Sequence, residues 1–238
     1  GDRLMAGASR RFAEALSQVD RTIQYSLEDA LGLVKKLATA KFDETVEMAI
    51  GLGIDPKYSD QMVRGTCVLP HGTGRTVKVL VFARGEKAEE ARAAGADHVG
   101  EDDLADRIMQ GWIDFQVVIA TPDMMKVVGK LGKVLGPRGL MPNPKTGTVT
   151  TEIGEAVRES KGGKITFRTD KQGNVNAPIG KASFDQKALE ENAMMFLEKI
   201  MQLRPSGAKG RYLMSVSVSS TMGPGVHMDV NDVRAHLR

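Results

Sequence analysis

Five basic residues and no acidic residue lie between Met124 and Thr151, in a chain whose charges are otherwise mixed. From Leu135 to Thr148, glycines and prolines alternate with cations. Because Pro removes a backbone donor and Gly weakens helices and strands, this stretch is predicted to be a shaped loop that contains neither element. A concentrated positive field attracts a polyanion. The segment therefore indicates binding of a polyanion.

Enzymatic chemistry has little support in the spacing of the reactive side chains. The segment 72–74 lacks the third glycine of a dinucleotide loop, and the basic loop lacks the Gly-Lys-Thr spacing of a Walker loop. The four histidines show neither metal-ligand spacing nor pairing with a Ser or Cys. Cys67 is interpreted as a small core residue, and the acidic run 101–103 as a solvated helix start. We predict no catalytic residue, no cofactor and no metal.

Three short segments each allow two interpretations. Lys41 and Phe42 are either a helix-terminal cation and a core aromatic, or a cation and an exposed ring at an RNA groove. Met222, in a turn rich in Ser, Thr and Gly, is either anchored inward or presented to a partner. Arg168 and Lys171 flank a turn, where ordinary surface charges are also common. Residue types alone leave these alternatives open.

The composition is that of a globular protein with a local basic surface. The chain has 238 residues, 41% hydrophobic content and a net charge of +3, so it can bury a core in one large domain or two small ones. Aromatic residues make up only 5%, so a folded RNA read by shape suits the chain better than splayed single-stranded bases. A single cysteine, no membrane-length apolar run and no signal-peptide core lead us to expect an intracellular, cytoplasmic protein.

The two ends of the chain are expected to mix helices with half-buried strands. Helices are predicted at residues 7–19, from the capping box that begins at Ser26, and at 185–203. Alternation with period two predicts a strand at 43–50, with Val46, Met48 and Ile50 on one face. Further strands are expected at 62–69, at 165–169 followed by a turn and a return strand at 174–177, and at 211–219, where Tyr212, Met214, Val216 and Val218 are spaced by two.

The middle of the chain alternates between strands and helices. Strands are expected at 77–82, 97–99 and 115–120, and helices at 86–94, 102–110 and 151–160. Thr121, Pro122 and Asp123 have the order of an N-cap, a first helical position and a first-turn acid. The apolar run 77–82 is typical of a strand covered on both faces, so a small parallel sheet with helices on both faces is predicted.

The economical topology has two domains. A discontinuous α+β domain would comprise residues 1–70 and 161–238, with a Rossmann-like α/β domain of residues 71–160 inserted into it. Both crossings contain glycine, as a two-strand hinge would. The inserted segment has 12 Lys and Arg against 13 Asp and Glu, and the remainder has 21 against 17. The discontinuous domain is therefore the more basic of the two.

The basic loop also carries a family motif. Leu131-Gly-x-x-Leu-Gly-Pro-Arg-Gly-Leu-Met-Pro-Asn-Pro-Lys-x-Gly-Thr148 resembles the signature of the L-one family of ribosomal proteins, bacterial type. Shorter motifs extend the resemblance over essentially the whole chain, among them those at 40–47, 53–56, 60–66, 95–97, 120–123, 177–181, 207–210 and 221–224. One departure is Asn176, where many relatives have His.

The resemblance implies a non-enzymatic, two-domain protein in the mobile stalk of the large ribosomal subunit. It implies binding to a folded segment of large-subunit rRNA, contact with deacylated tRNA that leaves the exit site, and repression of translation through the leader of its own mRNA. We expect a monomer when the protein is free. Alternatives from other classes are a nucleotide-dependent enzyme, for which no phosphate loop is visible, and an assembly scaffold that holds RNA without moving.

Carried over by motif, the implied rRNA-binding residues all belong to the discontinuous domain: Lys41, Phe42, Thr45, Glu47, Arg168, Asp170, Ser215, Thr221, Met222 and Gly223. Hydroxyl groups and backbone amides suit 2′-OH and phosphate, and cations fix the register. The two carboxylates can accept from base amino groups or 2′-OH, or can orient Arg168. Lys133, Arg138 and Lys145 of the basic loop are candidates for a second RNA contact, or the loop stiffens its domain. The segment after Gly225 is assigned no role.

Overall fold

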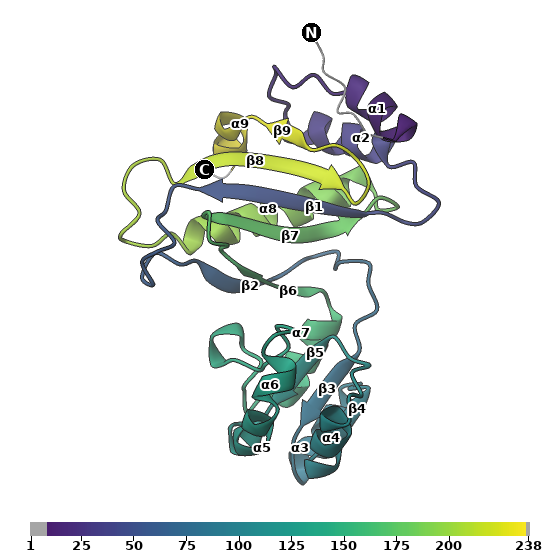
Figure 1. The fold of residues 1–238 in the computed structure, drawn as a ribbon, viewed down its shortest axis with the longest axis vertical. Coiled ribbons are helices and arrows are strands. Elements are labelled where there is room, and N and C mark those ends of the chain that lie inside the picture. Colours follow the sequence, from purple (N-terminus) through teal and green to yellow (C-terminus); the bar gives the residue numbers. More distant parts are fainter. Residues whose placement is uncertain (1–8, 237–238) are drawn as a thin grey trace. The chain divides into compact units, whose positions relative to one another are not determined.

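The computed structural model, which describes residues 9–236, shows a mixed arrangement of helices and sheets (Figure 1). The mixed α/β class expected from the sequence is confirmed. The chain forms two compact units: unit 1 runs to Gly74 and resumes at Ile165, and unit 2 comprises Arg75–Lys164. Each unit is described by itself.

Unit 1 is built on a four-stranded antiparallel sheet with the order β7-β1-β8-β9. The strands are β1 (Thr45–Leu52), β7 (Asn174–Lys181), β8 (Leu213–Ser220) and β9 (Val226–Met228). Val46, Met48 and Ile50 of β1 are fully buried, as their alternation predicts. Strand β1 comes from the first segment of the unit, and both of its neighbours come from the second.

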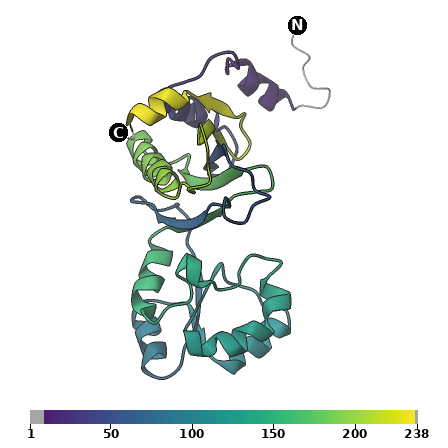
Figure 2. The same ribbon diagram turned by 90° about the vertical axis from the view of Figure 1, so that its left-hand side faces the viewer.

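Helices cover one face of this sheet. Helix α2 (Leu27–Leu37) packs against β8 and β9, and helix α8 (Gln186–Gln202) packs against β7 (Figure 2). The predicted cap of α2 is confirmed, because Ser26 Oγ accepts a hydrogen bond from Asp29 N at 3.1 Å. The predicted apolar stripe of α8 is fully buried at Leu189, Ala193, Phe196, Leu197 and Ile200.

Helix α1 (Arg10–Ser17) begins after its cap, Ser9. The expected start of this helix at residue 7 lies outside the described residues.

A separate two-stranded sheet pairs β2 (Arg64–Val68) with β6 (Lys164–Arg168). The prediction that residues 174–177 return alongside 165–169 is wrong, because β7 pairs with β1 instead. Hydrogen bonds at the end of β6 show why. Thr169 N donates to Val63 O at 2.9 Å, and Val63 N donates to Thr169 Oγ1 at 3.0 Å, so β6 is already paired with the segment before β2.

Strand β8 departs from its expected alternation at Met214. The register of β8 against β1 shifts between Gly51 and Leu52, so that Ser215 lies opposite Gly51 while Leu213 lies opposite Leu52. An irregularity of this kind inserts an extra residue and reverses the direction of the side chains beyond it. Leu213 is therefore buried, and Met214 is 56% exposed.

The segment after Gly225 completes the sheet. Val226 and Met228 of β9 are buried against the core, and α9 (Val230–His236) packs on β8 with Val233 buried. Arg234 donates to Leu213 O at 3.0 Å. The sequence did not reveal this role, because a strand of three residues has too little pattern to be recognised.

Unit 2 contains a three-stranded parallel sheet with the order β4-β3-β5. Its strands are β3 (Val79–Phe82), β4 (His98–Gly100) and β5 (Val117–Ala120). Its helices are α3 (Glu86–Ala93), α4 (Asp102–Met109), α5 (Met125–Lys130), α6 (Gly132–Leu135) and α7 (Ile153–Lys161). Leu80 and Phe82 pack with residues of α4, α5 and α6, whereas Val79 and Val81 pack with residues of α3 and α7. The predicted parallel sheet with helices on both faces is confirmed.

The connection from β5 to α5 is a short 3₁₀ helix, η1 (Pro122–Met124). Thr121 occupies the predicted N-cap position and Pro122 the first helical position, but the Thr121 side chain makes no capping hydrogen bond. Thr121 therefore lies at the expected N-cap position, but its side chain does not form the capping hydrogen bond.

We expect Met228→Ala to lower the free energy of unfolding by about 2–5 kcal/mol, because the substitution removes a buried side chain from the core of unit 1. His227→Ala is the matched control, because His227 is exposed on the same strand and its loss should cost less than about 0.5 kcal/mol. Urea denaturation measures both. Equal stability of the two variants would show that β9 does not contribute to the core.

Candidate nucleic-acid interface

Glu44 connects the two segments of unit 1 at the start of β1. Its side chain is only 2% exposed, and its carboxylate accepts hydrogen bonds from Ala40 N and Met222 N, each at 2.9 Å. Burial by itself raises the pKa of Glu44. Hydrogen bonds, chiefly those from Met222 N and Ala40 N, and the charge of Arg11 together outweigh this effect, so the pKa lies below its ordinary value. One ionised carboxylate thus holds the turn before β1 against the turn after β8.

Thr221 strengthens the same junction. Its Oγ1 accepts from Thr45 N at 2.9 Å and donates to Thr45 O at 3.3 Å, so the side chain continues the β1–β8 ladder beyond Ser220. Thr45 itself is buried, and its hydroxyl accepts from Lys181 Nζ at 2.9 Å. Thr45 therefore positions Thr221 and Lys181, the two residues to which it is hydrogen-bonded.

Phe42 and Met222 point outward from these two turns. Phe42 is 53% exposed and Met222 is 49% exposed, so Phe42 is not a core aromatic and Met222 is not anchored inward. Gly223 lies behind Met222, where a Cβ would come within 2.4 Å of Ser220 Oγ, so only glycine fits this turn unchanged. Lys41 is exposed and, in the part of the chain that the structure describes, forms no ion pair.

The face of the sheet that the helices leave uncovered carries mostly small or polar side chains. Along β1 it presents Glu47, Ala49 and Gly51. Their partners on β8 are Ser219, Ser217 and Ser215, and their partners on β7 are Pro178, Asn176 and Asn174. A Cβ at Gly51 would come within 2.5 Å of Ser215 Oγ, so any other residue here would force the Ser215 hydroxyl to move. Side chains of this size leave hydroxyl and amide groups accessible over a nearly flat surface.

The far end of this face is organised by Asp170. Its carboxylate accepts from Asn174 N and Gln172 N, each at 2.8 Å, and from Asn174 Nδ2 at 3.2 Å. The hydrogen bond from Asn174 N is the main reason that the pKa of Asp170 lies below its ordinary value. Arg168 is exposed and is not paired with Asp170 within residues 9–236. The carboxylate shapes the turn and leaves the guanidinium free.

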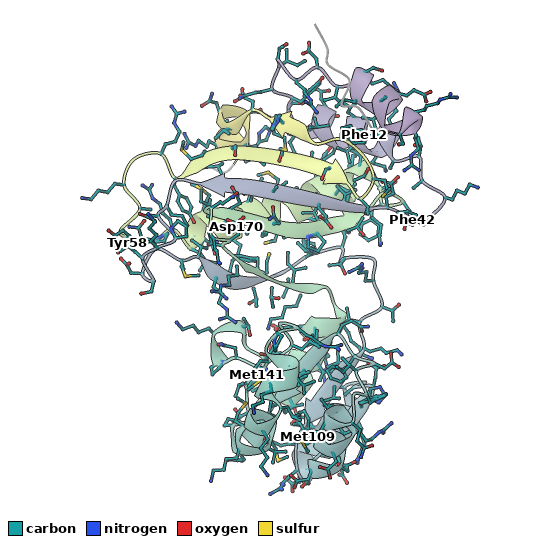
Figure 3. All side chains as sticks on the ribbon, in the orientation of Figure 1. Phe12, Phe42, Tyr58, Met109, Met141 and Asp170 are labelled. Carbon is teal, nitrogen blue, oxygen red and sulfur yellow. The ribbon has the colours of Figure 1, made fainter. Side chains whose placement is uncertain are left out.

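The sequence-predicted residues of unit 1 therefore lie in two groups with the polar face between them. Figure 3 shows Phe42 at one end of the sheet and Asp170 toward the other. Glu47 lies on the face itself, and Ser215 lies opposite Gly51, whose other partner, Asn174, is bound by Asp170. Four further polar residues of this face were not predicted as contacts: Asn174, Asn176, Ser217 and Ser219. The alternation of serines from 215 to 219 was the available signal.

The basic loop of unit 2 is an ordered structure built around Asn143. Asn143 N donates to Thr148 Oγ1 at 2.8 Å, Lys145 N donates to Asn143 Oδ1 at 2.8 Å, and Thr146 Oγ1 donates to Asn143 O at 2.9 Å. The prediction that this stretch contains no helix is wrong for η2 (Pro144–Thr146), a 3₁₀ helix. Pro is compatible with its first position, because no backbone donor is needed there.

Two of the three candidate cations, Arg138 and Lys145, lie in this loop, and the third, Lys133, lies on helix α6 just before it. Lys133, Arg138 and Lys145 are all exposed, and none forms an ion pair among the described residues. The loop is held to the end of β5, because Ala120 N donates to Thr148 O at 2.9 Å and Thr150 N donates to Ala120 O at 3.2 Å. Its charges are therefore presented from a fixed backbone.

Other candidate chemistry from the sequence has structural explanations. Glu101 pairs with Arg84 at 2.6 Å, and Asp103 accepts from Glu101 N at the start of α4. Over residues 9–236, no group of His, Cys, Asp and Glu side chains is placed to hold a metal ion. No helix in this described range combines the length and apolar character needed to cross a membrane.

Comparison with known proteins gives concordant matches. Residues 34–224 match the Ribosomal protein L1p/L10e family. The large ribosomal subunit protein uL1 of Thermobifida fusca (strain YX) is 56% identical over 226 residues, which cover 95% of this chain and 96% of that protein. The protein of the same name from Streptococcus gordonii (strain Challis) is 58% identical over 229 residues, which cover 96% of this chain and 100% of that protein.

Replacement of Glu44 tests whether its carboxylate holds the junction. We expect Glu44→Ala to cost about 1–3 kcal/mol of the free energy of unfolding, because two backbone donors lose their acceptor. Glu198→Ala, an exposed glutamate on α8, is the control and should be close to neutral.

The pH dependence follows from the lowered pKa. A depressed folded-state pKa gives stability that is present above the ordinary value of 4.5 and lost as the pH falls through the folded value. The stability difference between wild type and Glu44→Ala should therefore shrink on acidification. A difference that stays constant from neutral pH to pH 3 would contradict the role of the ionised form.

Proposed function

Because the chain belongs to the ribosomal protein L1p/L10e family, we propose that it is a non-enzymatic constituent of the large ribosomal subunit that binds folded rRNA of the mobile stalk. The observation that carries this proposal is the junction at Glu44. It presents an aromatic ring, a methionine and an exposed lysine beside a polar sheet face. Its site of action would be the ribosome in the cytoplasm, with the free protein monomeric.

The chemistry of this face suits RNA. Hydroxyl groups of the serines, amide groups of the asparagines and the carboxylate of Glu47 can meet 2′-OH groups and base edges. Phe42 and Met222 offer apolar surfaces to a ribose or a base, while Lys41 and Arg168 are free to neutralise phosphates. The ordered turns at both ends mean that little conformational entropy is lost on binding.

We also propose that units 1 and 2 are the two domains, with crossings at 74/75 and 164/165. Unit 1 would bind the rRNA. The basic loop of unit 2 would approach a second RNA, the deacylated tRNA that leaves the exit site. Its support is the exposure of Arg138 and Lys145 on a loop fixed to β5, with Lys133 exposed on the preceding helix α6.

Repression of the protein's own translation would use the same face of unit 1. A leader of its mRNA that folds like the rRNA segment would compete for Phe42, Met222 and the polar face. Variants should then lose affinity for both RNAs in parallel. A variant that loses only one of them would contradict a shared face.

Met222→Asp and Thr221→Ala test the rRNA face. We expect each to weaken binding to the stalk segment of large-subunit rRNA by about 1–3 kcal/mol, because an apolar contact or the β1–β8 junction is lost. The measurement is a binding titration over a series of salt concentrations, with random duplex RNA as competitor. Met195→Asp is the control, since Met195 is also exposed but lies on α8. Unchanged affinity of both variants at matched salt would overturn the site.

Charge reversal tests the basic loop. The variant with Lys133→Glu, Arg138→Glu and Lys145→Glu should slow release of deacylated tRNA from the ribosome while the affinity for rRNA stays the same. Arg92→Glu with Arg158→Glu, two exposed cations of unit 2 outside the loop, is the control. Unchanged release of tRNA would leave the loop with a structural role only.

A further inference from the structure

Exposed apolar side chains mark both ends of the β1–β8 pair. The structure describes eight large hydrophobic residues with exposed side chains, and four of them adjoin these two strands: Phe42, Tyr58, Met214 and Met222. Phe42 precedes β1 and Met222 follows β8, whereas Met214 lies at the start of β8 and Tyr58 follows β1. Since β1 and β8 are antiparallel, each end carries one aromatic ring and one methionine. Phe42 and Met222 belong to the site described above, whereas Tyr58 and Met214 do not.

Met214 is held beside the loop that carries Tyr58. The register shift between Gly51 and Leu52 turns Met214 outward. Gly53 N then donates to Tyr212 O at 2.7 Å, and a Cβ at Gly53 would lie 3.5 Å from Met214 Cγ. The methionine therefore lies directly against the start of the loop 53–61.

The loop 53–61 is ordered by its own hydrogen bonds. Tyr58 N donates to Asp55 O at 3.2 Å, Gln61 N donates to Tyr58 O at 3.1 Å, and Gln61 Oε1 accepts from Asp55 N at 2.8 Å. Tyr58 is nevertheless 59% exposed. The hydrogen bonds order the backbone of the turn, and the ring that it carries is uncovered. A partner can therefore contact this ring without a large loss of backbone conformational entropy.

This end is continuous with the polar face and carries its own cations. Met214 precedes Ser215, and Figure 3 shows Tyr58 and Asp170 toward the same end of the sheet, away from Phe42. Lys57, Lys209 and Arg211 are exposed, and none forms an ion pair within the described residues. Free cations beside an exposed ring suit a phosphate backbone with an unstacked base.

We propose that Tyr58 and Met214 form a second RNA contact, which receives a base or ribose from another segment of the RNA bound at Phe42 and Met222. This inference rests on the proposed function. The eight residues of β1 separate the two contacts by roughly 25 Å. The ligand must therefore be an RNA whose fold presents two separate segments at that spacing. Neither a short single strand nor a small hairpin loop would engage both.

Paired serine substitutions test the contact. We expect Tyr58→Ser with Met214→Ser to lower the affinity for the stalk segment of large-subunit rRNA about tenfold or more, and Tyr58→Phe to retain it, because the ring makes the contact. Val68→Ser with Met195→Ser, which removes two other exposed apolar side chains of unit 1, should bind like wild type. Urea denaturation confirms that all variants are folded. A double variant that is folded and binds like wild type would overturn the inference, and so would a loss of affinity in Tyr58→Phe.

Tethered cleavage tests the geometry independently. Lys41→Cys and Lys57→Cys each place one accessible thiol at one end, while burial raises the pKa of the Cys67 thiol and keeps it from competing for the reagent. An iron chelate on each thiol should cut two separate segments of the bound rRNA. Cleavage of the same nucleotides from both positions, or none from position 57, would overturn the second contact. Failure of wild type to bind this rRNA at low salt would instead overturn the proposed function.

Discussion

The pairing of β1 on both of its edges with strands from the second segment is the constraint on which unit 1 depends. Val46 lies opposite Gly180 on one side and Ser220 on the other, so the sheet closes only after the chain has passed through unit 2 and returned. Such pairing costs loop-closure entropy before its contacts form. The proposed RNA face inherits this dependence, because Phe42 and Glu44 come from one segment while Thr221 and Met222 come from the other.

A buried carboxylate at this junction needs a physical explanation, because an unpaired buried charge is costly. Glu44 is tolerated because Ala40 and Met222 direct backbone N–H groups at it. The same two hydrogen bonds fix the turns from which Phe42 and Met222 project. The stability of the junction is thus coupled to the exposure of the two apolar side chains. The backbone N–H groups that compensate the burial of Glu44 belong to the same turns that carry Phe42 and Met222.

Side-chain size distinguishes the two faces of the sheet, one of which packs in the core while the other is the proposed RNA face. The inward residues of β1, Val46, Met48 and Ile50, are large and fully buried under α2 and α8. The outward residues are mostly small or polar, and the glycine at position 51 leaves room for the Ser215 hydroxyl. The backbone of the proposed RNA face is therefore accessible, and large exposed apolar side chains lie at its ends. In unit 2, Arg138 and Lys145 stand on a loop ordered by Asn143.

The sequence by itself determined the local elements and the family. Period-two alternation identified β1 and its buried face, the Ser26 cap and the apolar stripe of α8 were read correctly, and the alternating middle segment indicated a parallel sheet covered on both faces. These features follow from residues within one or two turns or one strand of each other, where periodicity reports the buried side directly.

The tertiary structure decided which strands pair and which side chains remain outside. It placed β6 beside β2, turned Met214 outward at a register shift, left Phe42 and Met222 exposed, and built β9 and α9 from a segment without a clear pattern. Apart from β9 and α9, which pack on the nearby β8, these outcomes depend on distant parts of the chain. Strands β1 and β6 select their partners through hydrogen bonds to residues more than a hundred positions away. A turn residue is buried or exposed according to what packs against it from the other end of the chain.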